Sequence, residues 1–107
     1  MDYIRNDFET ILERRDAKLE GSYTNYLFEQ GTDKILKKIG EEASEVIIAA
    51  KNEKNEETVG EICDLLYHTL VLMAHQGISI EDVENELEKR AQKAGNLKKF
   101  HKVDKNS

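Results

Sequence analysis

The sequence predicts an all-α fold, a bundle of four to five helices, on the strength of three observations. Glu, Lys, Leu and Ile dominate the composition, and 36% of the 107 residues are charged, which suits a helical protein with a well-hydrated surface. Apolar residues recur at helical spacing, and no stretch alternates as a half-buried strand would. The polar breaks between apolar stretches are short, so neighbouring helices are expected to pack antiparallel.

The first third of the chain is expected to hold one helix and one irregular segment. Residues 2–19 show near-helical spacing, whereas residues 20–33 contain two glycines and several polar residues, which indicates a loop or short helical turn. The residues expected to be buried are Ile4, Phe8, Ile11, Leu12 and Leu19 in the helix, and Tyr23, Tyr26, Leu27 and Phe28 in the turn.

Two long helices should follow. The first would be capped by Thr32 or Asp33 and run to about Lys51, and the second would cover about 56–75, with Asn55 as its cap and Gly77 at its end. Residues 52–57 would turn the chain between them. The inward positions are expected to be Ile35, Leu36, Ile39, Val46, Ile47 and Ala50 in the first, and Val59, Ile62, Leu65, Leu66, Leu70 and Met73 in the second.

A fourth helix is expected near the C-terminus. Ser79 and Asp82 have the spacing of a capping box, and the helix would run from there to about Ala94. Its inward residues would be Ile80, Val83 and Leu87. The chain is therefore expected to form a single helical domain over 1–95, followed by a basic tail over 96–107.

The net charge of −6 is unevenly distributed. Residues 89–107 hold seven lysine and arginine residues against one aspartate, so residues 1–88 carry −12. An acidic body repels nucleic acid, so no nucleic-acid partner is expected, and an anionic ligand would need a bound cation or the basic tail. The plainer interpretation of that tail is a solvated, partly disordered end.

The remaining bulk features concern the compartment. No apolar run approaches the roughly 20 residues that a membrane span needs, and the polar, acidic N-terminus does not resemble a secretory signal. A single cysteine, Cys63, excludes an internal disulfide and fits a reducing environment, where it is expected to be a small core residue. We therefore expect a cytoplasmic protein with no membrane partner.

The two long helices carry the residues with the clearest chemical meaning. Glu42 and Glu45 are three residues apart, as are Glu61 and Asp64, so each pair lies on one helical face. An antiparallel hairpin would let these faces oppose each other, and four converging carboxylates would repel one another unless a cation bound. All-oxygen ligands favour Mg²⁺, Mn²⁺ or Ca²⁺. Alone, the first pair would be a weak signal, because glutamate-rich helical faces are usually solvated.

Nearby residues admit two interpretations each. Gly40 and Gly60 precede the acids, where the missing Cβ would let a ligand or a backbone approach, although Gly60 equally fits a weakly formed first turn. His68 shares the face of Glu61 and Asp64, so it could orient a carboxylate or touch a substrate. It could equally be a half-buried histidine bonded to a neighbour.

The acidic pattern resembles a known signature. Glu41, Glu42 and Glu45, followed by Glu61 and Asp64, resemble the EExxE…ExxD motif of the all-helical nucleoside triphosphate pyrophosphohydrolases, the MazG-like superfamily. Within that group, three further blocks resemble the phosphoribosyl-ATP pyrophosphatase family, and together they cover about residues 3–90. These blocks read GSYTNYLFEQGTDKILKKIGEEASEV, DLLYHTLVLM and VENELEKR. One departure is GEIC before Asp64, where the family has smaller residues.

The resemblance implies a specific reaction and assembly. It implies Mg²⁺-dependent hydrolysis of phosphoribosyl-ATP to phosphoribosyl-AMP and pyrophosphate, the second step of histidine biosynthesis, with Mn²⁺ as a substitute. It further implies a homodimer in which helices of two subunits complete the bundle and the site. A domain of this size looks like the monofunctional form, with the following cyclohydrolase on another chain as an associated partner.

The resemblance also assigns roles to residues. Glu42, Glu45, Glu61 and Asp64 would be the metal ligands, and Glu41 would either bind a second ion or orient the attacking water. The substrate-binding candidates are Lys38, Arg90, Lys37, Ser22, Tyr23, Thr24 and His68. Lys38 could instead pair with Glu41 or Glu42, Arg90 could pair with Glu86, and Tyr23 could serve packing alone.

Two alternatives to this function stay open on the sequence. One is a housecleaning enzyme of the same fold that hydrolyses another nucleoside triphosphate. The other is a non-catalytic helical interaction module in which the acids form no more than a solvated stripe.

Overall fold

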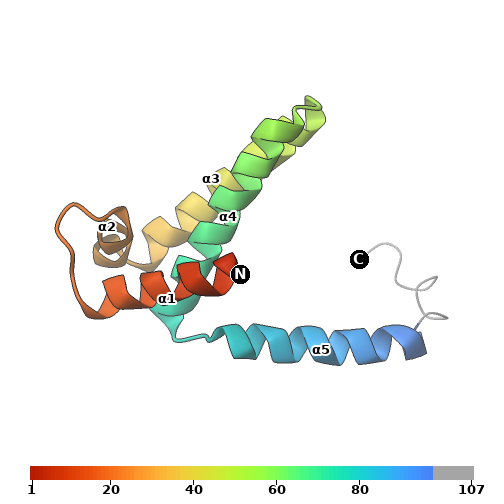
Figure 1. Ribbon diagram of the computed structural model, residues 1–107. Helices are drawn as coiled ribbons and strands as arrows, with labels where there is room; N and C mark the ends of the chain where they lie inside the picture. Colours follow the sequence, from red (N-terminus) through yellow and green to blue (C-terminus); the bar gives the residue numbers. More distant parts are fainter. Residues whose placement is uncertain (98–107) are drawn as a thin grey trace.

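The computed structural model describes residues 1–97, and the side chains of residues 1–93. It contains α1 (Tyr3–Asp16), α2 (Tyr23–Gln30), α3 (Thr32–Lys51), α4 (Asn55–Gln76) and α5 (Ile80–Leu97), with no strand in the described part of the chain (Figure 1). The expected all-α class is confirmed. The segment expected to be a loop or short helical turn is a helix of two turns, and the first helix ends at Asp16, three residues earlier than expected.

The helices pack around one end of a long hairpin. α3 and α4 run antiparallel along each other, and α1 and α2 lie against the end of this hairpin that is farther from the turn joining the two helices (Figure 1). α5 leaves the body and projects away from it. The other end of the hairpin forms an arm, residues 40–65, where α3 and α4 pack against each other and no other described helix lies alongside them (Figure 1).

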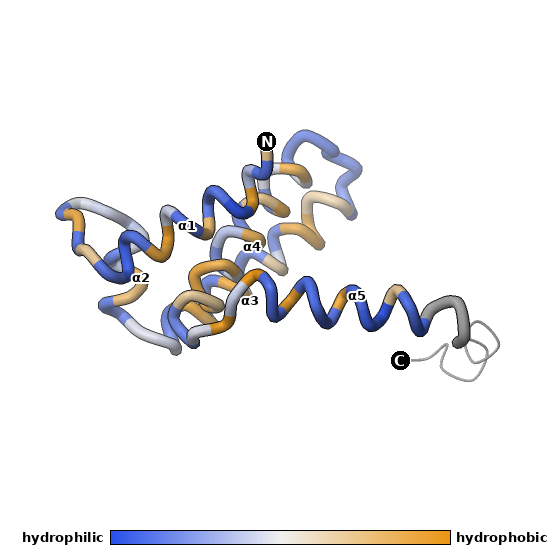
Figure 2. The backbone as a smooth tube through the Cα atoms, turned by 60° about the horizontal axis from the view of Figure 1, so that its bottom comes forward, coloured by the Kyte–Doolittle hydropathy of each residue, from blue (hydrophilic) through white to orange (hydrophobic). Residues whose placement is uncertain are grey.

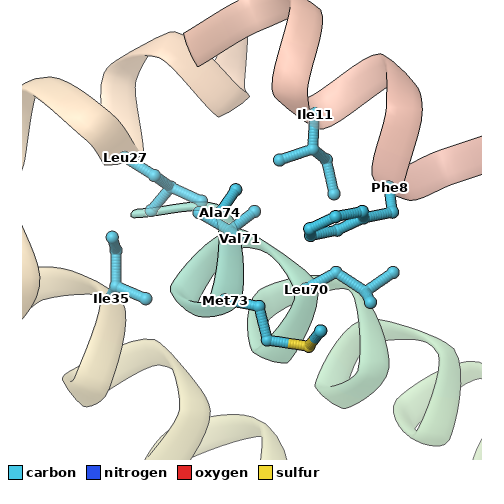
Figure 3. Packing of buried hydrophobic residues seen from close by; sticks show 8 residues of the cluster. All are labelled: Phe8, Ile11, Leu27, Ile35, Leu70, Val71, Met73 and Ala74. Carbon is cyan, nitrogen blue, oxygen red and sulfur yellow. The ribbon is translucent and has the colours of Figure 1, made fainter. Parts of the chain in front are cut away.

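The core lies where α1, α2, α3 and α4 meet. Leu27, Ile35 and Val71 are fully buried there, each from a different helix. The rest of the cluster consists of Phe8, Ile11, Leu70, Met73 and Ala74 (Figure 3). Each such side chain contributes about 1.5–3 kcal/mol by leaving water, so this cluster holds α2 against the hairpin.

Several positions expected to face inward are exposed in the single chain. On the arm, Ile47 is 68% exposed, and Val59 and Ile62 are also exposed, because no third helix covers this part of the hairpin. Apolar residues are visible along the arm in Figure 2. Cys63, expected in the core, is exposed as well. In the turn before α3, Leu27 is buried as expected, whereas Tyr23 and Tyr26 are partly open to solvent.

The inward face expected for α5 is open too. Ile80 packs against the core, but Val83 is 40% exposed and Leu87 59% exposed. These residues line an apolar groove of about 430 Å³ together with Ile4, Leu66, Leu70 and Met73. Two ion pairs from Arg5 of α1, to Glu81 at 2.6 Å and Glu84 at 2.7 Å, tie the start of α5 to the body.

The capping predictions had mixed outcomes. Gly77 ends α4 in the left-handed conformation (φ 75°), and Ser79 and Asp82 form the expected capping box, with reciprocal hydrogen bonds of 2.9 and 3.0 Å. The expected caps of α3 and α4 were wrong. Gly31 and Lys54 occupy those positions without a side-chain bond, since the chain enters each helix through a tight turn.

Asn25 organises the connection between α1 and α2. It is buried, its side-chain amide donates to the carbonyl of Arg14, and its Oδ1 accepts from the backbone N–H of Leu19 at 2.9 Å. Ser22 caps α2 by accepting from the N–H of Asn25 at 3.2 Å. These bonds fix where α2 begins, and therefore where Tyr23 and Thr24 lie.

The C-terminal expectations lie mostly beyond the described part. α5 runs through Leu97 rather than ending near Ala94, and the rest of the expected basic tail lies outside the described residues. No helix in the described part of the chain is both long and apolar enough to cross a membrane.

Candidate active site

Three of the predicted acidic residues meet on the arm. Glu42 comes from α3, and Glu61 and Asp64 come from α4, and one carboxylate oxygen of each lies within 4.8 Å of the others. Glu61 and Asp64 share a face of α4 because they are three residues apart. The antiparallel hairpin turns Glu42 toward them. Glu42 and Glu61 are partly buried, whereas Asp64 is exposed.

Glu45 lies close to this group without completing it. Partial burial raises the pKa of Glu61, and the negative charges of Glu45, Glu42 and Asp64 raise it further. Four carboxylates therefore act on one another, although only three bring oxygens within 4.8 Å. In the metal-free protein Glu61 therefore binds a proton more readily than an ordinary glutamate does.

The donor set fits a hard divalent cation. Three carboxylates from two helices offer only oxygen, which suits Mg²⁺ or Mn²⁺ better than a softer metal. A cation here would remove the repulsion that raises the pKa of Glu61.

Lys38 lies at the edge of the acidic group. Its ammonium nitrogen is 3.3 Å from Glu41 and 3.7 Å from Glu42, so the intrahelical pairing considered from the sequence does occur. The hydrogen bond to Glu41 raises the pKa of Lys38. Glu41 is exposed and turned toward Lys38, outside the group of three. Lys37 is also exposed on α3.

A chain of hydrogen bonds connects α2 to α4, the helix that carries Glu61 and Asp64. The hydroxyl of Tyr23 is 3.0 Å from Nε2 of His68, and Nδ1 of His68 is 2.7 Å from the backbone carbonyl of Asp64. His68 is only 5% exposed. One residue along, Thr24 and Tyr67 bond through their hydroxyls. Ser22 uses its hydroxyl as the cap of α2, and the bonds of Tyr23 and Thr24 place the start of this helix beside α4.

Arg90 lies elsewhere in the single chain. It is on α5, its side chain is 74% exposed, and its Nε is 3.2 Å from Glu86, which is the pairing considered as an alternative. Since α5 projects away from the arm (Figure 1), one chain does not bring Arg90 to the acids.

The two helical glycines have open space beside them. A Cβ at Gly40 or Gly60 would meet no described atom within 4 Å, so no neighbouring backbone explains them. Gly60 also lies beyond the first turn of α4, which begins at Asn55, so the first-turn explanation was wrong. Room for a ligand stays a prediction.

Sequence reasoning missed two contacts beside this site. Lys34 places its ammonium 5.8 Å from the ring centre of Tyr26, and that ring stacks on Tyr23 at 6.0 Å. Tyr67 packs against the core, and its hydroxyl also ties α4 to Thr24. The three-residue spacing of the two tyrosines on α2 was the available signal for the first.

Comparisons with known proteins show what this chain is similar to. The model of the family described as phosphoribosyl-ATP pyrophosphohydrolase matches residues 5–91. The phosphoribosyl-ATP pyrophosphatase of Clostridium botulinum (strain Hall) is 59% identical over 96 residues, which cover 90% of this chain and 87% of that protein. That of Clostridium novyi (strain NT) is 51% identical over 98 residues, covering 92% and 89%.

A longer relative carries the same domain. The histidine biosynthesis bifunctional protein HisIE of Oceanobacillus iheyensis is 62% identical over 80 residues, which cover 75% of this chain but 37% of that protein. The resemblance, the all-helical fold and the hydrolase class expected from the sequence are therefore confirmed. This chain belongs to the phosphoribosyl-ATP pyrophosphohydrolase family.

Proposed function

We propose that this protein hydrolyses phosphoribosyl-ATP between its α- and β-phosphates, releasing phosphoribosyl-AMP and pyrophosphate in the second step of histidine biosynthesis. The observation that carries the proposal is the meeting of Glu42, Glu61 and Asp64 within 4.8 Å, in a chain of this family. A triphosphate is strongly anionic, so an acidic wall can hold it only through a cation.

The proposed metal ligands are Glu42, Glu61 and Asp64, with Glu45 beside them. Mg²⁺, or Mn²⁺ in its place, would supply charge neutralisation at the phosphates and a more acidic bound water. The contribution of the chain is to hold the carboxylates in place. The raised pKa of Glu61 supports this arrangement, because, besides burial, the negative charges of Glu45, Glu42 and Asp64 raise it.

Glu41 and Lys38 would work at the rim. Glu41 is exposed and lies outside the group of three, so its carboxylate is available to orient the attacking water or to bind a second ion. Lys38 already lies within 4 Å of two carboxylates and would exchange Glu41 for a phosphate oxygen when the substrate binds. Further proposed substrate contacts are Ser22, Tyr23, Thr24 and Lys37, with His68 behind them.

We further propose that the protein works as a homodimer. The apolar groove beside α5 and the exposed apolar residues of the arm, such as Ile47 and Val59, are surfaces that a second copy would cover. Arg90 would then reach the acids only from the partner chain. A mass measurement in solution tests this, with Leu87→Glu expected to shift the protein toward monomer.

The cellular setting completes the proposal. The single cysteine fits a reducing cytoplasm. Because a relative is named a bifunctional histidine biosynthesis protein, an association with the next enzyme, the cyclohydrolase, is proposed as well. The division into a domain over 1–95 and a basic tail stays a prediction.

Turnover of phosphoribosyl-ATP, with and without Mg²⁺, is the decisive experiment. Release of pyrophosphate should require the metal, and Glu42→Gln or Asp64→Asn should lower kcat by at least about 100-fold, since each removes a ligand. Glu57→Gln is the matched control, because Glu57 is an exposed acid one turn before Glu61 on the same helix. Turnover that survives chelation, or equal loss in the control, would overturn the proposal.

A further inference from the structure

His68 is a buried polar side chain whose two ring nitrogens both have partners. It lies one turn after Asp64 on α4 and is 5% exposed. Nδ1 lies 2.7 Å from the backbone carbonyl oxygen of Asp64, and Nε2 lies 3.0 Å from the hydroxyl of Tyr23. At this level of burial the ring itself is not open to a bound substrate.

The first partner fixes the tautomer of the ring. A carbonyl oxygen can only accept a hydrogen bond, so Nδ1 must carry the proton. In the neutral ring Nε2 then has a lone pair, and the hydroxyl of Tyr23 donates to it. The rings of Tyr23 and Tyr67 stand edge-on to the imidazole, at 5.8 and 5.0 Å, and they keep it in this orientation.

The tautomer decides what Tyr23 can offer to the site. Its only hydroxyl hydrogen is used by His68, so the oxygen facing the site is an acceptor. Tyr23 can therefore accept a hydrogen bond from a bound group but has no hydrogen left to donate.

We propose that His68 is a positioning residue, which, protonated at Nδ1 in its neutral form, holds the hydroxyl of Tyr23 so that the Tyr23 oxygen meets a bound substrate only as a hydrogen-bond acceptor. The substrate contact of Tyr23 rests on the proposed function. The direction of the Tyr23 bond in the neutral ring does not, because it follows from the two partners of His68.

A neighbouring bond supplies the control. Thr24 and Tyr67 also tie α2 to α4, one residue away from the Tyr23–His68 bond. Tyr67→Phe removes that tie and leaves the bond between His68 and Tyr23 in place. If His68 merely fastened α2, Tyr67→Phe and Tyr23→Phe would have similar effects. If His68 acts through Tyr23, Tyr23→Phe should weaken substrate binding more than Tyr67→Phe does.

The first test is a ¹⁵N NMR measurement on the metal-free protein, which needs no turnover. In the neutral ring the Nδ1 resonance of His68 should be that of a protonated nitrogen, and the Nε2 resonance that of a hydrogen-bonded acceptor. Tyr23→Phe should move Nε2 to the position of an unbonded acceptor, and Tyr67→Phe should leave it in place. A protonated Nε2 in the neutral ring would overturn the inference.

The second test is kinetic and uses phosphoribosyl-ATP with Mg²⁺. Tyr23→Phe and His68→Asn should each raise KM by about 3–10-fold with little change in kcat, and the double variant should resemble either single one, because the residues act in series. Tyr23→Phe removes one oxygen from a ring that is 45% exposed, so the fold should survive even if His68→Asn destabilises it.

The outcomes separate the two proposals. A wild-type protein that does not turn over phosphoribosyl-ATP would overturn the proposed function, while the NMR result would still decide the tautomer. Turnover with an unchanged KM in Tyr23→Phe, or additive effects in the double variant, would overturn the positioning role of His68.

Discussion

The turn between α3 and α4 offers the sharpest test of how the arm is held. Glu53 has φ 58°, in the left-handed region, and its N–H bonds to the carbonyl of Ala50 at 3.0 Å while that of Lys54 bonds to Ala49 at 3.1 Å. This is the Schellman arrangement, in which glycine is the preferred residue at the left-handed position. In the described side chains, Glu53 takes part in no ion pair, so replacing it loses no contact.

The expected gain from Glu53→Gly follows from two opposing contributions. The left-handed conformation costs a residue with a Cβ about 1–2 kcal/mol. Glycine also increases the conformational entropy of the unfolded chain, which lowers the free energy of unfolding by about 0.4–1 kcal/mol. The free energy of unfolding should therefore rise by about 0.5–1 kcal/mol, which is about 2–8 °C in Tm for a domain of this size.

Thermal melts followed by circular dichroism, at one protein concentration, check this prediction. Asn52→Gly is the matched control, because Asn52 adjoins Glu53 but has φ −86°, so glycine there should lower Tm. Gly77→Ala, at the equivalent position of α4, should lower it too. A fall in Tm for Glu53→Gly, or the same change in Asn52→Gly, would refute the reasoning. Turnover should be unchanged, since the acids stay in register.

Three further predictions address the site, the core and α5. The pKa of Glu61 is raised in the folded protein, so ionisation of Glu61 opposes folding. In the absence of metal, Glu61→Gln should have the same Tm as wild type at acid pH and a higher Tm as the pH rises through the ordinary glutamate range. A Tm difference that does not depend on pH would contradict this. Leu27→Ala should lower the free energy of unfolding by about 2–5 kcal/mol in urea titrations, because Leu27 is fully buried; a loss below about 1 kcal/mol would mean that α2 is not anchored there. Arg5→Ala removes exposed ion pairs to Glu81 and Glu84, so melts should show a loss of less than about 1 kcal/mol per pair that disappears at high salt.

The acidic group illustrates how far sequence reasoning reaches. Helical spacing places Glu61 and Asp64 on one face, and a short turn makes the hairpin antiparallel, so the approach of Glu42 to both followed from local rules. The same rules cannot say that Glu45 stays outside the closest group, because that depends on side-chain angles and on the exact rotation of α3.

The misses have a common physical origin. Val83, Leu87 and Ile47 were expected to be buried because their spacing is amphipathic, but periodicity shows only which face is apolar and not what covers it. Cys63 was expected in the core by its residue type, which does not show what covers it either. Nor does spacing reveal where a helix such as α5 points, and that placement removes Arg90 from the acids in one chain.

The helix caps failed for a different reason. Thr32 is a good capping residue by type, yet Gly31 precedes α3 with φ 88°, a conformation that glycine adopts easily and that starts the helix without a side-chain bond. Thr32 instead contacts His75 of α4, with Oγ1 3.1 Å from Nε2. The contact with His75, which is distant in the sequence, replaced the capping role that the residue type of Thr32 favours. The residues next to Thr32 in the sequence could not reveal this contact.

The residues of α4 that stabilise the fold and those of the candidate active site lie on different turns of the helix. Val71 and Ala74 anchor the helix in the packed centre, while Glu61 stands about 15 Å away, at 1.5 Å per residue, where few other side chains depend on it. A cluster of mutually repelling charges is tolerable in so small a protein because it lies away from the buried core. The repulsion acts on the arm and not on the packed part of α4. Substitutions near Glu61 should therefore be free to alter what is bound while the fold survives.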